Sequence, residues 1–98
     1  MIRVTSQKLR ETKEQLEQMN NNLKAKAEEF TTSATSLLGK WDGDAKQVMD
    51  TNFKNDRIQM DNFVALIREY CTVLENQAVR YDNAESQNVQ LASERSYK

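Results

Sequence analysis

The chain contains no proline and no histidine, and it has only two glycines and one cysteine among its 98 residues. Without histidine, the commonest general base near neutral pH and the commonest metal ligand are both missing. Cys71 cannot form a disulfide within the chain, and a cysteine-rich zinc site is excluded. We therefore expect no enzymatic activity, no cofactor and no bound metal.

Charge of one sign is not in excess, since 14 Lys and Arg residues balance 15 Asp and Glu residues. This balance argues against a nucleic-acid partner and gives no general attraction to an anionic membrane. No apolar run is long enough to span a bilayer, so we expect no membrane span. The N-terminal residues also lack the apolar segment of a conventional secretory signal peptide.

The two glycines lie close together and mark the one predicted break between helices. Gly39 and Gly43 flank Trp41, and glycine readily ends a helix. Since proline is absent, nothing else forcibly interrupts a helix. The sequence predicts a single all-α domain over residues 1–98, folded as an antiparallel helix-turn-helix hairpin. We expect a helix over about 6–38, a turn at 39–43, a second helix over about 44–85 and a flexible tail at 86–98.

Apolar side chains recur every seven residues on both sides of this turn, the period of helices that pack along their length. One row contains Leu9, Leu16, Leu23, Phe30 and Leu37, and the other contains Phe53, Met60, Ile67, Leu74 and Tyr81. Smaller or additional apolar residues flank these rows: Ala27 and Ala34 upstream, and Phe63, Val64, Tyr70, Cys71 and Ala78 downstream.

The apolar stripe of the second helix is too broad for one neighbouring helix. Hydrophobic residues are only 38% of the chain, so a chain this short has difficulty burying enough surface alone. We therefore predict that the hairpin dimerises into a four-helix bundle. The predicted core and dimer contacts are Leu16, Leu23, Phe30, Leu37, Met60, Phe63, Ile67 and Leu74.

Two further residues have two interpretations each, and a third can form an ion pair within its helix. Cys71 is a small core residue or, alternatively, one half of a disulfide across the dimer. Asn20 lies on the row of the alanines, where it is either a buried polar residue that sets the helix register or partly exposed. Arg10 can form an ion pair with Glu14 four residues along the same helix.

Two short motifs lie at positions that resemble a known family. Trp41 and Gly43 form a Trp-x-Gly tripeptide between two predicted helices, and Tyr81 and Glu85 form Tyr-x-x-x-Glu near the end of the second. Together, on a chain of about one hundred residues, they resemble the WXG100 family of ESAT-6-like proteins. These are helical hairpins exported by the type VII secretion systems of mycobacteria and Gram-positive bacteria.

The resemblance implies that Trp41 and Gly43 form the turn motif and that Tyr81 and Glu85 form the secretion motif. It further implies a small non-catalytic protein that is cytoplasmic before export and then secreted without a conventional signal peptide. The expected partners are a second copy or a WXG100 paralogue, a secretion ATPase of the FtsK/SpoIIIE type and possible cargo such as a larger secreted toxin. Composition and heptads fit equally well a cytoplasmic helical adaptor or coiled-coil scaffold that is never exported.

Geometry adds two expectations about these motifs. Trp41 is predicted to bury its ring against the next helix near Ala45 or Val48. Counting outward from the turn places the start of the first helix beside residues near 77, so that Tyr81 and Glu85 lie on an overhang. If two hairpins pair antiparallel, the overhang of one approaches the Trp41 corner of the other, and a composite recognition surface exists only in the dimer.

Overall fold

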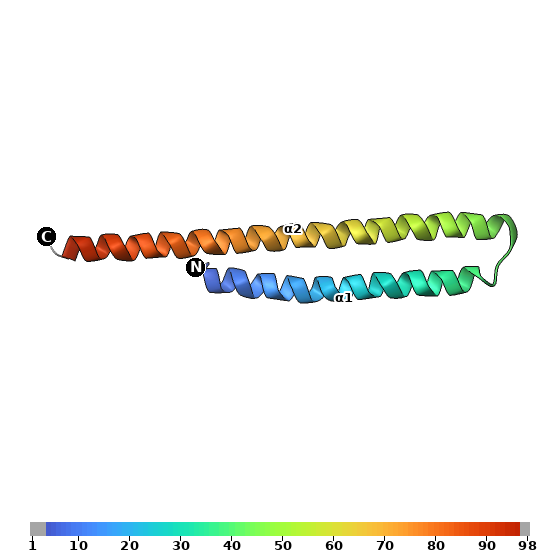
Figure 1. Ribbon diagram of the computed structural model, residues 1–98, viewed down its shortest axis with the longest axis horizontal. Helices are drawn as coiled ribbons and strands as arrows, with labels where there is room; N and C mark the ends of the chain where they lie inside the picture. The colour runs from blue at the N-terminus through green and yellow to red at the C-terminus, as the bar shows by residue number, and fades with distance from the viewer. Residues whose placement is uncertain (1–3, 97–98) are drawn as a thin grey trace.

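The computed structural model describes residues 4–96, and the side chains of residues 4–92, as two helices joined by a short turn (Figure 1). Helix α1 comprises Ser6–Leu38 and helix α2 comprises Gly43–Ser96. The helices lie antiparallel and side by side along the whole of α1 (Figure 1). The predicted all-α hairpin is confirmed, and the turn lies where the glycines placed it.

The hairpin is a rod with principal extents of 84 × 22 × 16 Å and a radius of gyration of 23.0 Å. A compact domain of this length has a radius of gyration of about 13 Å. Every part of the chain is therefore close to the surface, and each helix has only one neighbouring helix to pack against.

Helix α1 begins as the sequence predicts. Thr5 has extended backbone angles, and its hydroxyl oxygen accepts a hydrogen bond from the Lys8 backbone N–H at 3.2 Å. This is the geometry of a helix N-cap, which satisfies one of the N–H groups that has no partner within the helix.

Helix α2 is longer than predicted. It continues to Ser96, so residues 86–96 are helical where the sequence predicted a flexible tail; residues 97–98 lie outside the described residues. The side chains of residues 86–92 are exposed, but residues 86–96 contain no glycine or proline, and six of these eleven residues are Gln, Ala, Leu, Glu or Arg. Extending an existing helix through such residues avoids the cost of nucleation.

The two glycines of the turn have different conformations. Gly39 has right-handed helical angles, φ −62° and ψ −17°, and its N–H donates to the Thr35 carbonyl at 3.1 Å. Gly43, the first residue of α2, has φ 79° and is the one described residue with positive φ. Only Gly43 therefore needs the conformational freedom of glycine.

Small side chains fill the seam between the helices. The buried apolar residues are Ala27, Ala34, Leu38, Val64, Cys71 and Ala78. Ala78 is 0% exposed, so the two backbones approach closely at this level. The interpretation of Cys71 as a small core residue is confirmed.

The larger residues of the heptad rows lie beside this seam rather than within it. Leu16, Leu23, Phe30, Met60, Ile67 and Leu74 are half-buried. Leu37 and Phe63 are exposed, so they do not belong to the core of the single chain. Close approach favours small side chains at the centre, and bulky ones are displaced to the flank.

Polar side chains also cross the seam. Asn20 is 5% exposed, and its Nδ2 donates to the Val64 carbonyl at 3.1 Å; the buried interpretation of Asn20 is confirmed. Arg57 Nη1 donates to the Ala27 carbonyl at 2.9 Å and to the Thr31 hydroxyl at 2.6 Å. Each contact joins one side chain to a particular turn of the other helix, and together they fix the register of the hairpin.

The two glycines provide a matched test of the turn. Replacing Gly43 with Ala forces a side chain into the left-handed region and should lower the free energy of unfolding by about 1–2 kcal/mol. Gly39→Ala should be neutral or slightly stabilising, because its backbone angles suit alanine and an added Cβ meets ordinary contacts at 3.5 and 3.6 Å. Thermal unfolding followed by circular dichroism measures both variants. Equal losses of stability would contradict this assignment.

Candidate functional site

The two sides of the hairpin differ in chemistry. Phe30 and Phe53 contact each other edge to face, with ring centroids 5.6 Å apart. Because residues seven apart share a helix face, this contact places both heptad rows on the same side of the seam. We call this side the apolar face. It contains Leu9, Leu16, Leu23, Phe30 and Leu37 of α1, and Phe53, Met60, Phe63, Ile67, Tyr70, Leu74 and Tyr81 of α2.

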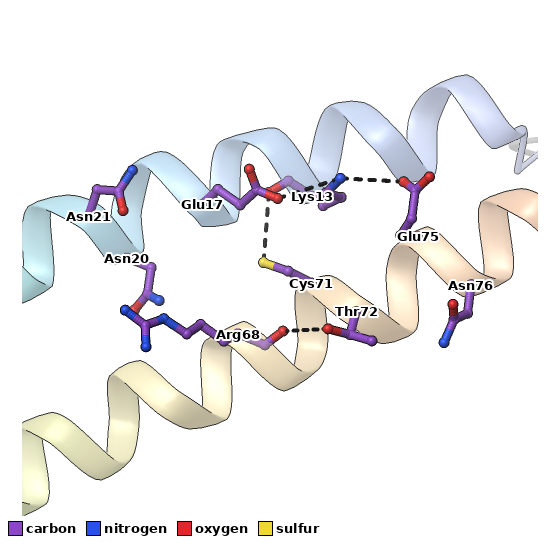
Figure 2. A pocket seen from close by; sticks show the side chains of 9 residues that line it. All are labelled: Lys13, Glu17, Asn20, Asn21, Arg68, Cys71, Thr72, Glu75 and Asn76. Carbon is purple, nitrogen blue, oxygen red and sulfur yellow. Dashed lines mark hydrogen bonds and ion pairs between the residues drawn. The ribbon is translucent and has the colours of Figure 1, made fainter.

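Charged residues that bond across the seam lie on the opposite side. Lys13 Nζ contacts Glu75 at 3.4 Å and Glu17 at 3.5 Å. Figure 2 shows Lys13 of α1 joined to both carboxylates. The pKa of the Lys13 ammonium is raised, first by the charge of Glu75. Lys13 thus pairs with Glu17 on its own helix, but its stronger electrostatic partner, Glu75, comes from the other helix.

A shallow polar groove of ≈ 510 Å³ runs along this side. Its lining includes Lys13, Asn20, Arg68 and Cys71 (Figure 2). The Cys71 thiol lies 3.9 Å from the Lys13 carbonyl, and Asn20 Oδ1 is buried with no hydrogen-bond partner within the chain. The lining mixes both charge signs with amides, which gives no preference for one class of ligand.

Polar contacts close the open end of the hairpin, away from the turn. Arg10 Nη1 contacts Asp82 at 2.8 Å, and Arg10 Nε contacts Glu75 at 3.6 Å. A hydrogen bond from the Ser6 hydroxyl, followed by the contact with Arg10, holds the pKa of the Asp82 carboxyl below its ordinary value. The hydrogen bond with Asp82 likewise raises the pKa of the Arg10 guanidinium. Arg10 thus reaches α2 rather than Glu14.

The Tyr81 and Glu85 side chains lie beside the start of α1. Both line an open groove of ≈ 450 Å³. The remaining lining residues are Val4, Thr5, Ser6, Ala84 and Asn88. Asn20 bonds to Val64 and Arg57 bonds to Ala27 across the seam, so residues whose numbers sum to 84 lie opposite each other and Ser6 lies opposite Ala78. The prediction that α1 starts beside residues near 77 therefore holds to within one residue. Tyr81 and Glu85 lie on the overhang of α2 just beyond that level, where Val4, Thr5 and Ser6 flank them.

The Trp41 corner is less buried than predicted. The Trp41 side chain is 37% exposed, and Val48 is 59% exposed. Ala45 is also exposed, so the indole ring is covered only in part in the single chain rather than fully buried. Trp41 instead remains available at the surface of the turn.

The two motifs lie at opposite ends of α1. Trp41 follows its last turn and Tyr81 lies beside its first turn. The 33 residues of α1 correspond to about 50 Å at 1.5 Å per residue. One molecule cannot present both motifs to a single small binding site.

Neither a metal site nor a membrane-spanning helix is found in the part of the chain that the structure describes. No group of three or more His, Cys, Asp or Glu side chains among residues 4–92 could hold a metal ion. Neither helix, over the same residues, is long and apolar enough to cross a membrane. The distinctive features are therefore surfaces: the apolar face, the Trp41 corner and the Tyr81–Glu85 groove.

Comparison with known proteins gives no relative: no protein-family model, no curated protein and no solved structure matches this chain.

Sequence reasoning missed the residues that connect the two helices through polar groups. No role was predicted for Arg57 or Asp82. Arg57 lies seven residues before the buried Val64, and Asp82 lies seven residues after Glu75, which pairs with Arg10. Antiparallel pairing counted from the turn could have identified their partners, because Asn20 with residue 64 and Ala27 with Arg57 have the same summed position.

Acid should weaken the open end of the hairpin. The pKa of folded Asp82 lies below the ordinary 3.8, so its stabilising charge is fully effective above that value. It is lost as the pH falls through the lowered folded pKa. We expect Asp82→Asn to unfold at a lower temperature than the wild type at pH 6, and the difference between the two midpoints to shrink as the pH falls below the ordinary 3.8. A constant difference across this range, measured by circular dichroism, would contradict the role of Asp82.

Proposed function

We propose that this protein is a non-catalytic export substrate of a type VII secretion system, of the WXG100 kind. The observation that carries the proposal is the placement of the two motifs on one hairpin. The Trp-x-Gly tripeptide forms the turn itself, with its indole at the surface, and Tyr81 and Glu85 lie one helical turn apart in an open groove. A receptor can read two side chains spaced by four residues as one surface.

The proposed receptor is a membrane-bound secretion ATPase of the FtsK/SpoIIIE type. The Tyr81 ring contributes an apolar surface to the groove, together with Val4 and Ala84. Glu85 adds a negative charge one turn away, so the matching site needs an apolar pocket beside a cation. The protein would be cytoplasmic before export and would act outside as an effector or as the helical partner or carrier of a larger secreted toxin.

Pairing of two hairpins through the apolar face is the second part of the proposal. The chain exposes 8040 Å², whereas a compact monomer of its 11.4 kDa mass exposes about 5,800 Å². Two hydrophobic side chains of the face, Phe63 and Tyr70, are more than half exposed. A second copy or a WXG100 paralogue would cover this face and complete a four-helix bundle.

Antiparallel pairing would also bring the two motifs together. In one chain they are separated by the length of α1, as described above. In an antiparallel pair, the open end of each hairpin lies next to the corner of the other, so Tyr81 of one copy approaches Trp41 of its partner. Export would then depend on correct assembly. The partial exposure of Trp41 supports this arrangement, because the indole has surface left to contribute to a partner.

Solution mass tests the pairing. We expect the wild type to have twice the mass of one chain, and Phe63→Asp to shift it to a single chain because a carboxylate would be buried in the apolar face. Ile58→Asp is the matched control, since Ile58 is 55% exposed and Phe63 is 54% exposed, but Ile58 lies outside that face. Light scattering after size exclusion measures all three. A wild type that is a stable helical monomer would contradict the proposal.

Export into the culture medium tests the motif. Tyr81→Ala and Glu85→Ala should each strongly reduce the secreted fraction in a host with a type VII system, while the amount inside the cell is retained. Glu69→Ala is the control, because it removes an exposed carboxylate from α2 outside the motif. If the wild type is never released, the protein is instead a cytoplasmic helical adaptor. If it is released but neither motif variant changes its release, Tyr81 and Glu85 are not the export signal and the proposal fails.

A further inference from the structure

The Tyr81–Glu85 groove depends on a contact that involves neither motif residue. Asp82 directly follows Tyr81 in α2, and successive residues of a helix point about 100° apart. Tyr81 therefore belongs to the apolar face, while Asp82 reaches Arg10 and Ser6 on the other flank of the seam. The same turn of α2 presents the motif outward and is attached to α1 by Asp82.

Apolar packing gives this turn little support. Ala78 is the last buried residue of α2 among those whose side chains are described, and it precedes Tyr81 by three positions. Beyond Ala78, Tyr81 is 41% exposed. The polar contacts of Asp82 thus hold the two helices together at the level of the motif.

Arg10 also selects the register in which α2 lies against α1. Its guanidinium reaches Glu75 at 3.6 Å and Asp82 at 2.8 Å, two carboxylates that are seven residues apart and share one helix face. A slip of α2 by three or four residues would replace Glu75 with Ala78 or Val79, and Asp82 with Glu85 or Ser86, so that at most one carboxylate would remain opposite Arg10. Both contacts exist together only in the observed register.

From this geometry we propose that Arg10 is a positioning residue for the Tyr81–Glu85 recognition surface, acting through Asp82. The inference rests on the proposed export function and adds a requirement to it. The receptor reads Tyr81 and Glu85 in a groove whose other wall is the start of α1, Val4 to Ser6. Arg10 fixes the distance and register between these walls. Exposed ion pairs contribute little to global stability, so the loss of Arg10 should disturb the groove without unfolding the hairpin.

The test compares two basic residues of α1. Arg10→Ala removes the attachment at the motif, and Asp82→Asn removes its other half. Lys13→Ala is the matched control, because it breaks a cross-helix ion pair with Glu75 at 3.4 Å but lies nearly one turn further from the groove. Arg10→Lys is the conservative variant, which keeps the charge opposite Asp82. All four are compared with Tyr81→Ala.

Two measurements are made on each variant: the exported fraction in the culture medium, and amide hydrogen exchange of the purified protein. Arg10→Ala and Asp82→Asn should lower the exported fraction several-fold and accelerate exchange at residues 78–88. Lys13→Ala should leave both near wild-type values, and Arg10→Lys should recover most of the export. Circular dichroism confirms that every variant remains helical.

The outcomes separate this inference from the proposed function. If Tyr81→Ala blocks export while Arg10→Ala and Asp82→Asn are exported like the wild type, Arg10 has no positioning role and the export motif stands. If Arg10→Ala and Lys13→Ala reduce export equally, Arg10 acts only through general stability and the inference is overturned. If Tyr81→Ala itself is exported normally, the proposed function fails first.

Discussion

The close approach of two helices along a seam of small side chains determines the rest of this structure. Ala27, Ala34 and Ala78 lie at the centre of the seam, where larger residues have no space. The leucines and phenylalanines of the heptad rows are consequently displaced to one flank, where a single neighbouring helix covers them only in part. The arrangement that closes the hairpin therefore also creates its apolar face.

Polar contacts determine the register that the alanine seam alone leaves open. An alanine fits opposite many neighbours, whereas Asn20 and Arg57 each bond to a carbonyl group of one particular turn, and Arg10 requires carboxylates at two defined positions. These contacts lie at the middle, at the turn side and at the open end of the hairpin. The apolar seam stabilises the association of the helices, and the polar residues specify how they are aligned.

The elements could be predicted from sequence because their signals are local. Thr5 caps α1, and the glycines mark the turn, whatever the rest of the chain does. Burial was less predictable, since hydrophobicity alone favours Leu37 and Phe63 for the core, whereas the helix spacing favours Ala27 and Ala78. The partner of Arg10 was also missed: Glu14 is near in sequence, but Asp82 becomes a neighbour only once the register is set. The continuation of α2 to Ser96 follows from helix propensity, which a search for buried anchors overlooked.

The two ends of the hairpin are held by different kinds of chemistry, and this gives the molecule a direction of unfolding. At the corner the helices are tied by the chain itself, which salt does not affect. At the open end they are joined by partly exposed charges, whose attraction weakens as ionic strength rises. Local opening will thus start at the open end, where α1 begins, and progress towards the turn. The corner keeps its structure longest.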